Sequence, residues 1–157
     1  MKRSKRILAL LLSMVLLFGM LPMSALAADS TFSDVKTSDW FYDDVRYVCE
    51  NGLMNGTGSG TFSPKATTTR GMIVTILHRL SGEPAVSGAC PFGDVAAEKY
   101  YEKAITWAAE NKIVSGYADG TFGPDNAITR EQLAAILYRY ATFCGYAVTA
   151  SAEISRF

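Results

Sequence analysis

The sequence predicts a mainly α-helical protein made of tandem helix–loop–helix repeats that pack together. Residues 32–80 align with residues 92–140 at a constant offset of 60 without a gap, and 15 of the 49 aligned pairs are identical. In each repeat, two segments carry apolar residues at helical spacing. Because a single repeat of this kind leaves its apolar stripes uncovered, we expect neighbouring repeats to pack against each other.

Residues 1–27 are predicted to form a secretory signal peptide. A basic start over residues 2–6 precedes an almost unbroken apolar run over residues 7–21, and the Ala-Leu-Ala that ends at Ala27 offers the small side chains that a signal peptidase needs. We expect cleavage after Ala27, with Ala28 as the runner-up. A membrane anchor is the alternative, but the run is short for a span of about 20 residues. The sequence therefore predicts no membrane span after signal cleavage.

The first repeat, residues 28–80, is expected to begin with a helix from about Trp40 to Asn51. Gly52 supplies a left-handed end for this helix. In the second repeat, residues 92–140, Lys112 stands at the equivalent position, so we expect that helix to end in a different way. The apolar positions of the two first helices are Phe41, Val45, Val48 and Cys49, and Tyr101, Ile105, Ala108 and Ala109.

A Gly-x-x-x-Gly-Thr-Phe-x-Pro segment follows the first helix of each repeat. Its glycines permit turns, and we expect Phe62 and Phe122 to pack these loops onto the core. At the start of the second helices, Thr129 and Gln132 form a capping box, whereas Thr69 can cap without a reciprocal partner at the fourth position. The apolar stripes of the second helices are Ile73, Ile76, Leu77 and Leu80, and Leu133, Ile136, Leu137 and Tyr140.

Two segments rich in small residues are predicted as linkers, residues 81–91 and residues 141–157. Phe157 matches the first residue of a repeat, so the second linker is expected to include the start of a third repeat. The three cysteines make an odd count, which excludes a closed disulfide framework. Free thiols are favoured over a pair between Cys90 and Cys144, because no spacing indicates a disulfide or a zinc site.

Charge excludes nucleic acid as a partner. The chain has a formal net charge of +0, but residues 1–28 hold four bases and no acid, which leaves 11 bases against 15 acids in the rest. A mildly acidic chain offers no basic field for nucleic acid.

The ordered motifs of the two repeats resemble the S-layer homology (SLH) family. Each repeat shows Phe-x-Asp-Val, an aromatic pair, a helix that ends in Asn, the glycine-containing loop and a Thr-Arg pair before the second helix. The resemblance implies modules that pack as a pseudo-threefold helical bundle, here incomplete with two full repeats. It also implies a secreted protein of the cell wall and S-layer surface, held without covalent linkage by an anionic, often pyruvylated, secondary cell-wall polysaccharide.

The Thr-Arg pairs are the predicted glycan contacts. The family's Thr-Arg-Ala-Glu motif falls on Thr69–Met72 and Thr129–Gln132, where Thr-Arg is kept and the final Glu is replaced. An arginine in the first turn of a helix opposes the helix dipole, and a guanidinium beside free backbone N–H groups suits a carboxylate. We expect Arg70 and Arg130 to line glycan-binding grooves, with Arg130 the stronger contributor. The alternative is that each arginine pairs with an acid, such as Asp34 or Asp94, and only ties the repeat together.

Aromatic side chains near these motifs could stack on sugar rings, with core or half-buried positions as the alternative. The loop of the second repeat also keeps the Asp-Gly that the family carries there. The full set of candidate glycan-binding residues is Arg130, Arg70, Thr129, Thr69, Gln132, Asp94, Asp34, Trp40, Tyr100, Asp119 and Gly120.

The sequence favours binding over catalysis. His78 is expected on an exposed helix face, and the acids Asp43 and Asp44 are expected on a solvated one, so no positioned acid–base pair is predicted. The loop around Asp119 lacks the bidentate Glu of a calcium site. We therefore predict no catalytic residue, metal or cofactor. A protein–protein interaction module of the cell envelope, with other surface-layer proteins as partners, and an anchor fragment of a larger cell-wall enzyme are left open.

Overall fold

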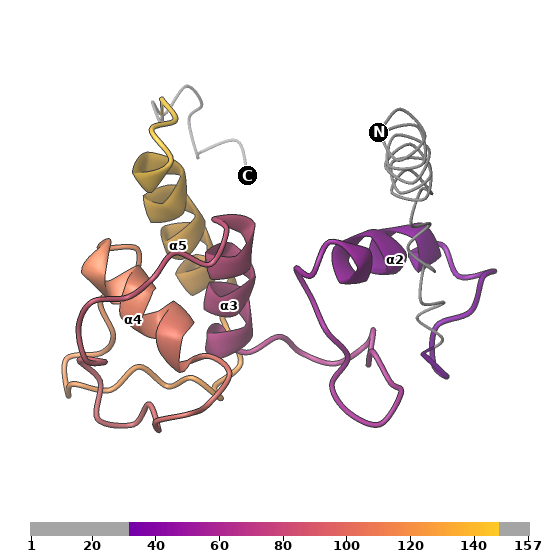
Figure 1. Ribbon diagram of the computed structural model, residues 1–157, viewed down its shortest axis with the longest axis horizontal. Coiled ribbons are helices and arrows are strands. Elements are labelled where there is room, and N and C mark those ends of the chain that lie inside the picture. Colours follow the sequence, from indigo (N-terminus) through magenta and orange to yellow (C-terminus); the bar gives the residue numbers. More distant parts are fainter. Residues whose placement is uncertain (1–31, 148–157) are drawn as a thin grey trace, which may run out of the picture. The chain divides into compact units, whose positions relative to one another are not determined.

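The computed structural model describes residues 32–147, and these residues hold four helices. In chain order the helices are α2 (Tyr42–Glu50), α3 (Arg70–Leu80), α4 (Glu102–Glu110) and α5 (Arg130–Phe143), as Figure 1 shows. Within this range, β structure is limited to two isolated bridges. The prediction of a mainly α protein is confirmed. The predicted signal peptide and the predicted start of a third repeat lie outside the described residues.

Each repeat contributes two helices, α2 and α3 in the first and α4 and α5 in the second. None of these helices, as far as the chain is described, has the length and apolar character to cross a membrane.

The second helix of each repeat begins at its predicted cap. The Thr69 hydroxyl accepts a hydrogen bond from the Met72 N–H at 3.2 Å. At α5, the Thr129 hydroxyl accepts from the Gln132 N–H and the Gln132 side chain accepts from the Thr129 N–H. The predicted capping box of α5 is confirmed.

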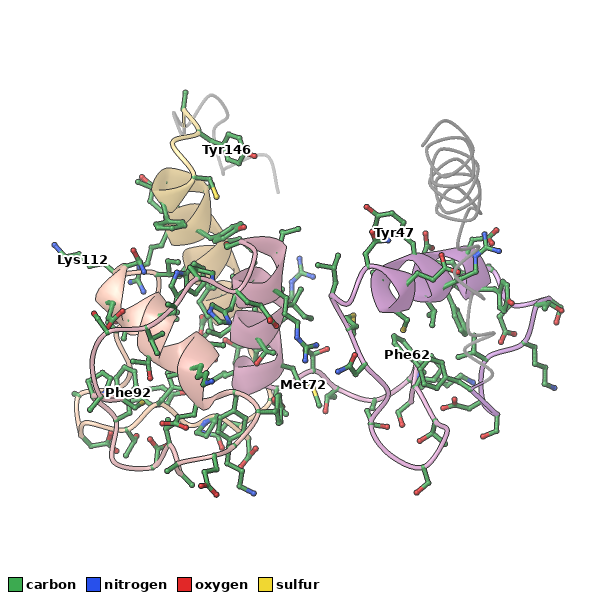
Figure 2. The ribbon with its side chains drawn as sticks, in the orientation of Figure 1. Tyr47, Phe62, Met72, Phe92, Lys112 and Tyr146 are labelled. Carbon is green, nitrogen blue, oxygen red and sulfur yellow. The ribbon has the colours of Figure 1, made fainter. Side chains whose placement is uncertain are left out.

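The first helices end in the same way in both repeats. Gly52 after α2 and Lys112 after α4 both adopt the left-handed conformation, with φ of 66° and 59°. In each case the next N–H donates to the carbonyl five residues before it, at 2.8 Å. The expectation that α4 would end differently is therefore wrong. Lys112 takes up a conformation that costs a residue with a Cβ roughly 1–2 kcal/mol, and Figure 2 shows its side chain directed outwards.

The core centres on the packing of α3 against α4. Val74 and Leu77 of α3 are buried with Ile105 and Trp107 of α4, and Phe122 from the second loop is fully buried among them. Two predictions are thereby confirmed, that the repeats pack together and that Phe122 packs its loop onto the core. The buried cluster comprises Val74, Leu77, Phe92, Val95, Tyr101, Ala104, Ile105, Trp107, Ala108, Ile113, Val114, Phe122 and Ile136.

The first repeat contributes much less to this core than the second. Val45 is the single buried residue of α2, and Phe62 is half-buried where its equivalent Phe122 is fully enclosed. Figure 2 labels Phe62 beside α2, in the loop of the first repeat. The equivalence of the two repeats in sequence therefore does not extend to their burial.

His78 is buried, contrary to the expectation of an exposed helix face. Its side chain is 7% exposed, and its ring lies 5.2 Å from that of Trp107, centroid to centroid. Its Nε2 lies 2.9 Å from the carbonyl oxygen of Pro84. The reason is tertiary: the face of α3 that carries His78 packs against α4. The equivalent Tyr138 of α5 is exposed, because in the described chain no helix covers it.

One predicted linker boundary is wrong. Residues 81–91 contain no helix, as expected, but α5 extends to Phe143, so the linker predicted from residue 141 begins inside this helix. Cys49, Cys90 and Cys144 are free cysteines in the described chain. Burial raises the pKa of the Cys49 thiol, which makes this cysteine less reactive.

Candidate functional site

The aspartates at the repeat starts hold the loops in place. Asp34 accepts hydrogen bonds from the N–H groups of Phe62 and Ser63 at 2.8 and 2.7 Å. Asp94 makes the same pair of bonds 60 residues further on, at 2.8 and 2.7 Å. The hydrogen bond from the Phe62 N–H is the main cause that holds the pKa of Asp34 below its usual value. Neither aspartate forms an ion pair with an arginine in the described chain. The alternative that Asp34 or Asp94 pairs with an arginine is therefore wrong.

The first turn of α3 is bound by the loop of the second repeat. The Arg70 N–H donates to the Asn126 carbonyl at 3.0 Å, and the Gly71 N–H donates to the Pro124 carbonyl at 2.8 Å. An isolated β-bridge between Thr69 and Ala127 flanks these bonds. The backbone donors that the sequence analysis expected to be free for an anion are therefore occupied at α3.

Arg70 is buried at the junction between the two repeats. Its Nε donates to the Phe122 carbonyl at 2.8 Å, and its guanidinium carbon lies 4.5 and 4.7 Å from the ring centroids of Phe122 and Tyr117. The residue is 6% exposed. Among the described residues no carboxylate lies within ion-pair distance of it. A carbonyl and two aromatic faces hold this cation, and no acid neutralises it.

The start of α5 carries the same Thr-Arg pair without a covering loop. Arg130 is exposed, and no acceptor for its N–H or for that of Glu131 is found in the described range. The Gln132 amide donates to the Tyr117 hydroxyl at 3.3 Å. Tyr117 therefore links the α5 cap to Arg70, whereas Arg130 lies on open surface.

A groove of about 400 Å³ lies between the first loop and α3. Arg79 is the one charged residue of its lining, and Tyr100 from the second repeat also faces it. The Arg79 guanidinium donates to the Leu53 carbonyl at 3.3 Å and lies 3.7 Å from the exposed Glu83 carboxylate. The lining consists of Leu53, Met54, Asn55, Gly56, Thr57, Phe62, Ser63, Pro64, Ala66, Thr67, Thr68, Met72, Thr75, Ile76, Arg79 and Tyr100.

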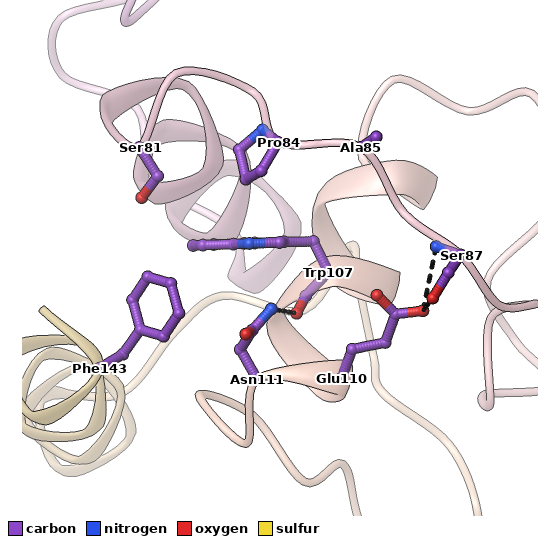
Figure 3. A pocket seen from close by; sticks show the side chains of 8 residues that line it. All are labelled: Ser81, Pro84, Ala85, Ser87, Trp107, Glu110, Asn111 and Phe143. Atoms are coloured by element: carbon purple, nitrogen blue, oxygen red, sulfur yellow. Dashed lines mark hydrogen bonds between the residues drawn. The ribbon is translucent and has the colours of Figure 1, made fainter.

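A second pocket, of about 610 Å³, lies near the C-terminal ends of α3, α4 and α5. Figure 3 shows the Trp107 indole edge-on to the Phe143 ring, with centroids 5.5 Å apart. The Asn111 amide donates to the Trp107 carbonyl at 2.8 Å, and the Glu110 carboxylate accepts from the Ser87 N–H at 3.3 Å. The polar groups of Asn111 and Glu110 are therefore already used within the protein. None of the predicted site residues lines it.

The remaining candidates are Trp40, Tyr100, Asp119 and Gly120. Trp40 is 88% exposed, which contradicts a core position, while Tyr100 is 56% exposed and lines the groove. The Asp119 carboxylate accepts from the Thr121 hydroxyl and N–H at 2.7 and 3.0 Å, and these bonds lower the pKa of Asp119. Gly120 follows with a φ of 83°. Asp119 and Gly120 therefore shape a turn.

Arg79 is the groove residue that the sequence reasoning misses. It is one of the identical pairs at the offset of 60, with Arg139 as its equivalent, and that identity was the available signal. An arginine near the end of an apolar helix otherwise resembles a solvated residue. The groove exists because the first loop folds back against α3, and no local pattern in the sequence reveals this contact.

Comparison with known proteins adds family information. The S-layer homology domain model matches residues 31–71 and 91–134. An endoglucanase of Bacillus sp. (strain KSM-635) is 34% identical over 88% of this chain, which corresponds to 15% of the enzyme. The S-layer protein sap of Bacillus anthracis is 28% identical over 71% of the chain and 14% of the relative. A cellulosome-anchoring protein of Acetivibrio thermocellus is 29% identical over 69% of the chain and 25% of the relative. The chain thus spans a quarter or less of each of these relatives.

Proposed function

Because the chain belongs to the S-layer homology domain family, we propose that it is a non-catalytic anchoring module that binds anionic cell-wall polysaccharide in the groove between its first loop and α3. S-layer homology domains anchor proteins to the cell surface, and this chain is a secreted, cell-wall-associated protein of that surface. The glycan, its acidic pyruvyl substituents and the position of the site are the proposal.

The chemistry of the groove lining is the observation that supports the proposal. The Thr67 hydroxyl, the Asn55 amide and the Thr57 and Ser63 hydroxyls, which bond each other at 2.6 Å, offer polar contacts to sugar hydroxyls beside the apolar side chains of the lining. The exposed ring of Tyr100 suits stacking against a sugar face. Such a mixture of polar and apolar lining residues fits a polysaccharide better than a purely apolar ligand.

Charge in the groove favours an acidic sugar. The lining holds one guanidinium, that of Arg79, and no carboxylate, in a chain whose acids outnumber its bases after residue 28. An arginine guanidinium can donate two parallel hydrogen bonds to one carboxylate. Arg70, which is buried and outside the groove lining, adds a second positive charge at the start of the same helix, without an acid beside it in the described chain. Arg130, Thr129 and Gln132 lie outside the groove lining, and the greater contribution expected of Arg130 stays a prediction.

Calorimetric titration with purified wall polysaccharide tests the site. Tyr100→Ala and Arg79→Gln should each weaken binding roughly ten- to a hundredfold, as the loss of a charge-assisted or stacked contact of about 1.5–3 kcal/mol implies. Arg139→Gln is the matched control, because it changes the equivalent arginine of the second repeat, which does not line the groove. Chemical removal of the acidic substituents from the glycan should reproduce the effect of Arg79→Gln.

Two results would contradict this site. If Tyr100→Ala and Arg79→Gln bind like the unmodified chain while circular dichroism shows them folded, the groove is not the glycan site. If Arg130→Ala alone abolishes binding, the glycan binds at the start of α5 instead. In an enzyme that carries such a module, we expect catalysis to come from other parts of the polypeptide.

A further inference from the structure

Two Asn-Gly dipeptides follow each other closely in the first repeat, at Asn51-Gly52 and at Asn55-Gly56. In such a pair the backbone nitrogen of the glycine can attack the side-chain amide carbon of the asparagine, because glycine has no Cβ to hinder the approach. A C–N bond forms, a succinimide ring closes, and the amide group leaves as ammonia with the proton of the attacking nitrogen. Water then opens the ring at either carbonyl, which gives aspartate or isoaspartate.

The first of these pairs is tied into the end of α2. The Gly52 N–H donates to the Cys49 carbonyl at 3.0 Å, and the Asn51 amide donates to the Tyr47 carbonyl at 2.8 Å. The attacking nitrogen and the leaving amide of this pair are therefore both engaged in the folded chain. Because the helix end must open before they can react, this pair should deamidate slowly.

The second pair lacks these restraints and lies in the groove. Asn55 is exposed, and the Gly56 N–H has no acceptor among the described residues. In the orientation that satisfies both of its polar groups, the Asn55 amide accepts from the Arg79 guanidinium and donates to the Met54 carbonyl, each at 3.2 Å. The guanidinium stabilises the negative charge that the amide oxygen develops during attack. This pair therefore combines an available nucleophile with a polarised carbonyl group.

The fold requires the glycine of this pair but not the asparagine. A Cβ on Gly56 would lie 2.5 Å from the Thr61 carbonyl oxygen and 2.6 Å from the Phe32 ring. The second repeat has the same restriction at Gly116, but Ser115 precedes that glycine. Serine has no amide to lose, so the equivalent position of the second repeat does not undergo this reaction.

We propose that Asn55 is a site of spontaneous deamidation, and that the product carboxylate pairs with Arg79 and weakens the binding of an acidic glycan in the groove. The effect on binding rests on the proposed function. Arg79 is the one charged residue of the groove lining. In the aspartate product, a carboxylate replaces the amide whose oxygen accepts from this guanidinium. The two charges then satisfy each other, and the groove loses its net positive charge.

The neighbouring charges leave this pairing open. The Glu83 carboxylate lies 3.7 Å from the Arg79 Nε and is exposed, whereas Asn55 faces a different nitrogen of the same guanidinium. The isoaspartate product brings the same negative charge and also lengthens the backbone next to the tightly packed Gly56. Both products should therefore bind an acidic glycan less well than the unmodified chain.

Peptide mapping by mass spectrometry tests the modification itself. The secreted full chain is incubated in mildly alkaline buffer, which favours loss of the proton from the attacking nitrogen. Fragment ions should place the conversion of amide to acid at Asn55 before Asn51, and an isoaspartate assay should detect the mixed product. Asn55→Ser is the matched control, because it introduces the residue of the second repeat, and it should stay unmodified. Asn55 that keeps its amide over weeks, or Asn51 that reacts first, overturns the proposal.

Asn55→Asp tests the effect of the product on the groove. Its new carboxyl group should titrate in NMR with a pKa below that of an ordinary aspartate, because the Arg79 guanidinium favours the charged form. Its affinity for the glycan should fall roughly tenfold or more, as in Arg79→Gln, while Asn55→Ser should stay within about threefold of the unmodified chain.

The outcomes separate this inference from the proposed function. An ordinary pKa in Asn55→Asp, or unchanged glycan affinity in Asn55→Asp where Arg79→Gln weakens binding, overturns the inference and leaves the proposed function standing. If neither Asn55→Asp nor Arg79→Gln changes the affinity, the groove is not the glycan site, and the effect on binding is overturned together with the proposed function. The mass measurement decides the modification in either case.

Discussion

Gly71 of α3 lies so close to the second loop that an added methyl group should weaken the packing of the two repeats against each other. A Cβ at this position would lie 2.9 Å from the Pro124 carbonyl oxygen and 3.0 Å from the ring of Tyr101. Helix propensity alone would favour Gly71→Ala by about 1 kcal/mol. Against this, the Gly71–Pro124 hydrogen bond contributes about 0.5–1.5 kcal/mol, and overpacking costs about 1–3 kcal/mol. We expect a net loss of about 1–3 kcal/mol.

Thermal unfolding followed by circular dichroism measures this effect. At about 4 °C per kcal/mol for a chain of this size, Gly71→Ala should lower the Tm by about 4–12 °C. Glu131→Ala is the matched control, because it changes the equivalent residue of α5, which is exposed, and should shift the Tm by no more than about 2 °C. A Tm that rises in Gly71→Ala would mean that helix propensity outweighs the contact, and would refute the close packing of the loop on α3.

Three further predictions concern the loops and helix ends. The folded-state pKa of Asp34 is below the unfolded value of 3.8, so its ionised carboxylate stabilises the fold above that value. This contribution is lost as the pH falls through the folded pKa. The difference in Tm between the unmodified chain and Asp34→Asn should therefore shrink between about pH 5 and pH 2. Gly52→Ala should lower the free energy of unfolding by about 1 kcal/mol, because φ is 66° at this position and nothing lies near the added Cβ. Lys112→Gly should raise the free energy of unfolding measured in urea by about 0.5 kcal/mol, after the greater conformational entropy of the unfolded glycine chain is subtracted. Phe122→Ala should lower the free energy of unfolding by about 3–5 kcal/mol in the same assay, and Phe62→Ala by clearly less, because Phe62 is half-buried. Equal losses would contradict the unequal burial of the two phenylalanines.

Much of the fold is predictable from the sequence because its signals are local. Apolar spacing located all four described helices, and the Thr129 cap and the packing role of Phe122 were predicted correctly. The errors have tertiary causes. His78 is buried because α3 meets α4, and Lys112 adopts a left-handed conformation because the helix end requires one whichever residue is present.

The candidate site was harder to predict, because it depends on contacts between repeats. The Thr-Arg motif located the start of α3, but the sequence did not indicate that the second loop occupies its backbone donors. It ranked Arg130 above Arg70 as a glycan contact, but it did not indicate that Arg70 is buried between two rings while Arg130 is exposed. Arg79 and Tyr100 face one groove from different repeats. Such a meeting of distant residues follows from the packing of the repeats rather than from any spacing along the chain.

Co-sedimentation with purified cell walls tests the central claim most directly. Walls from which the secondary polysaccharide has been extracted, and walls stripped of acidic substituents only, are compared with untreated walls. The anchoring account predicts that the chain sediments with untreated walls, loses most of its binding when the acidic substituents are removed, and does not bind the extracted walls. Equal binding to all three preparations would contradict it and would indicate a partner other than the anionic glycan.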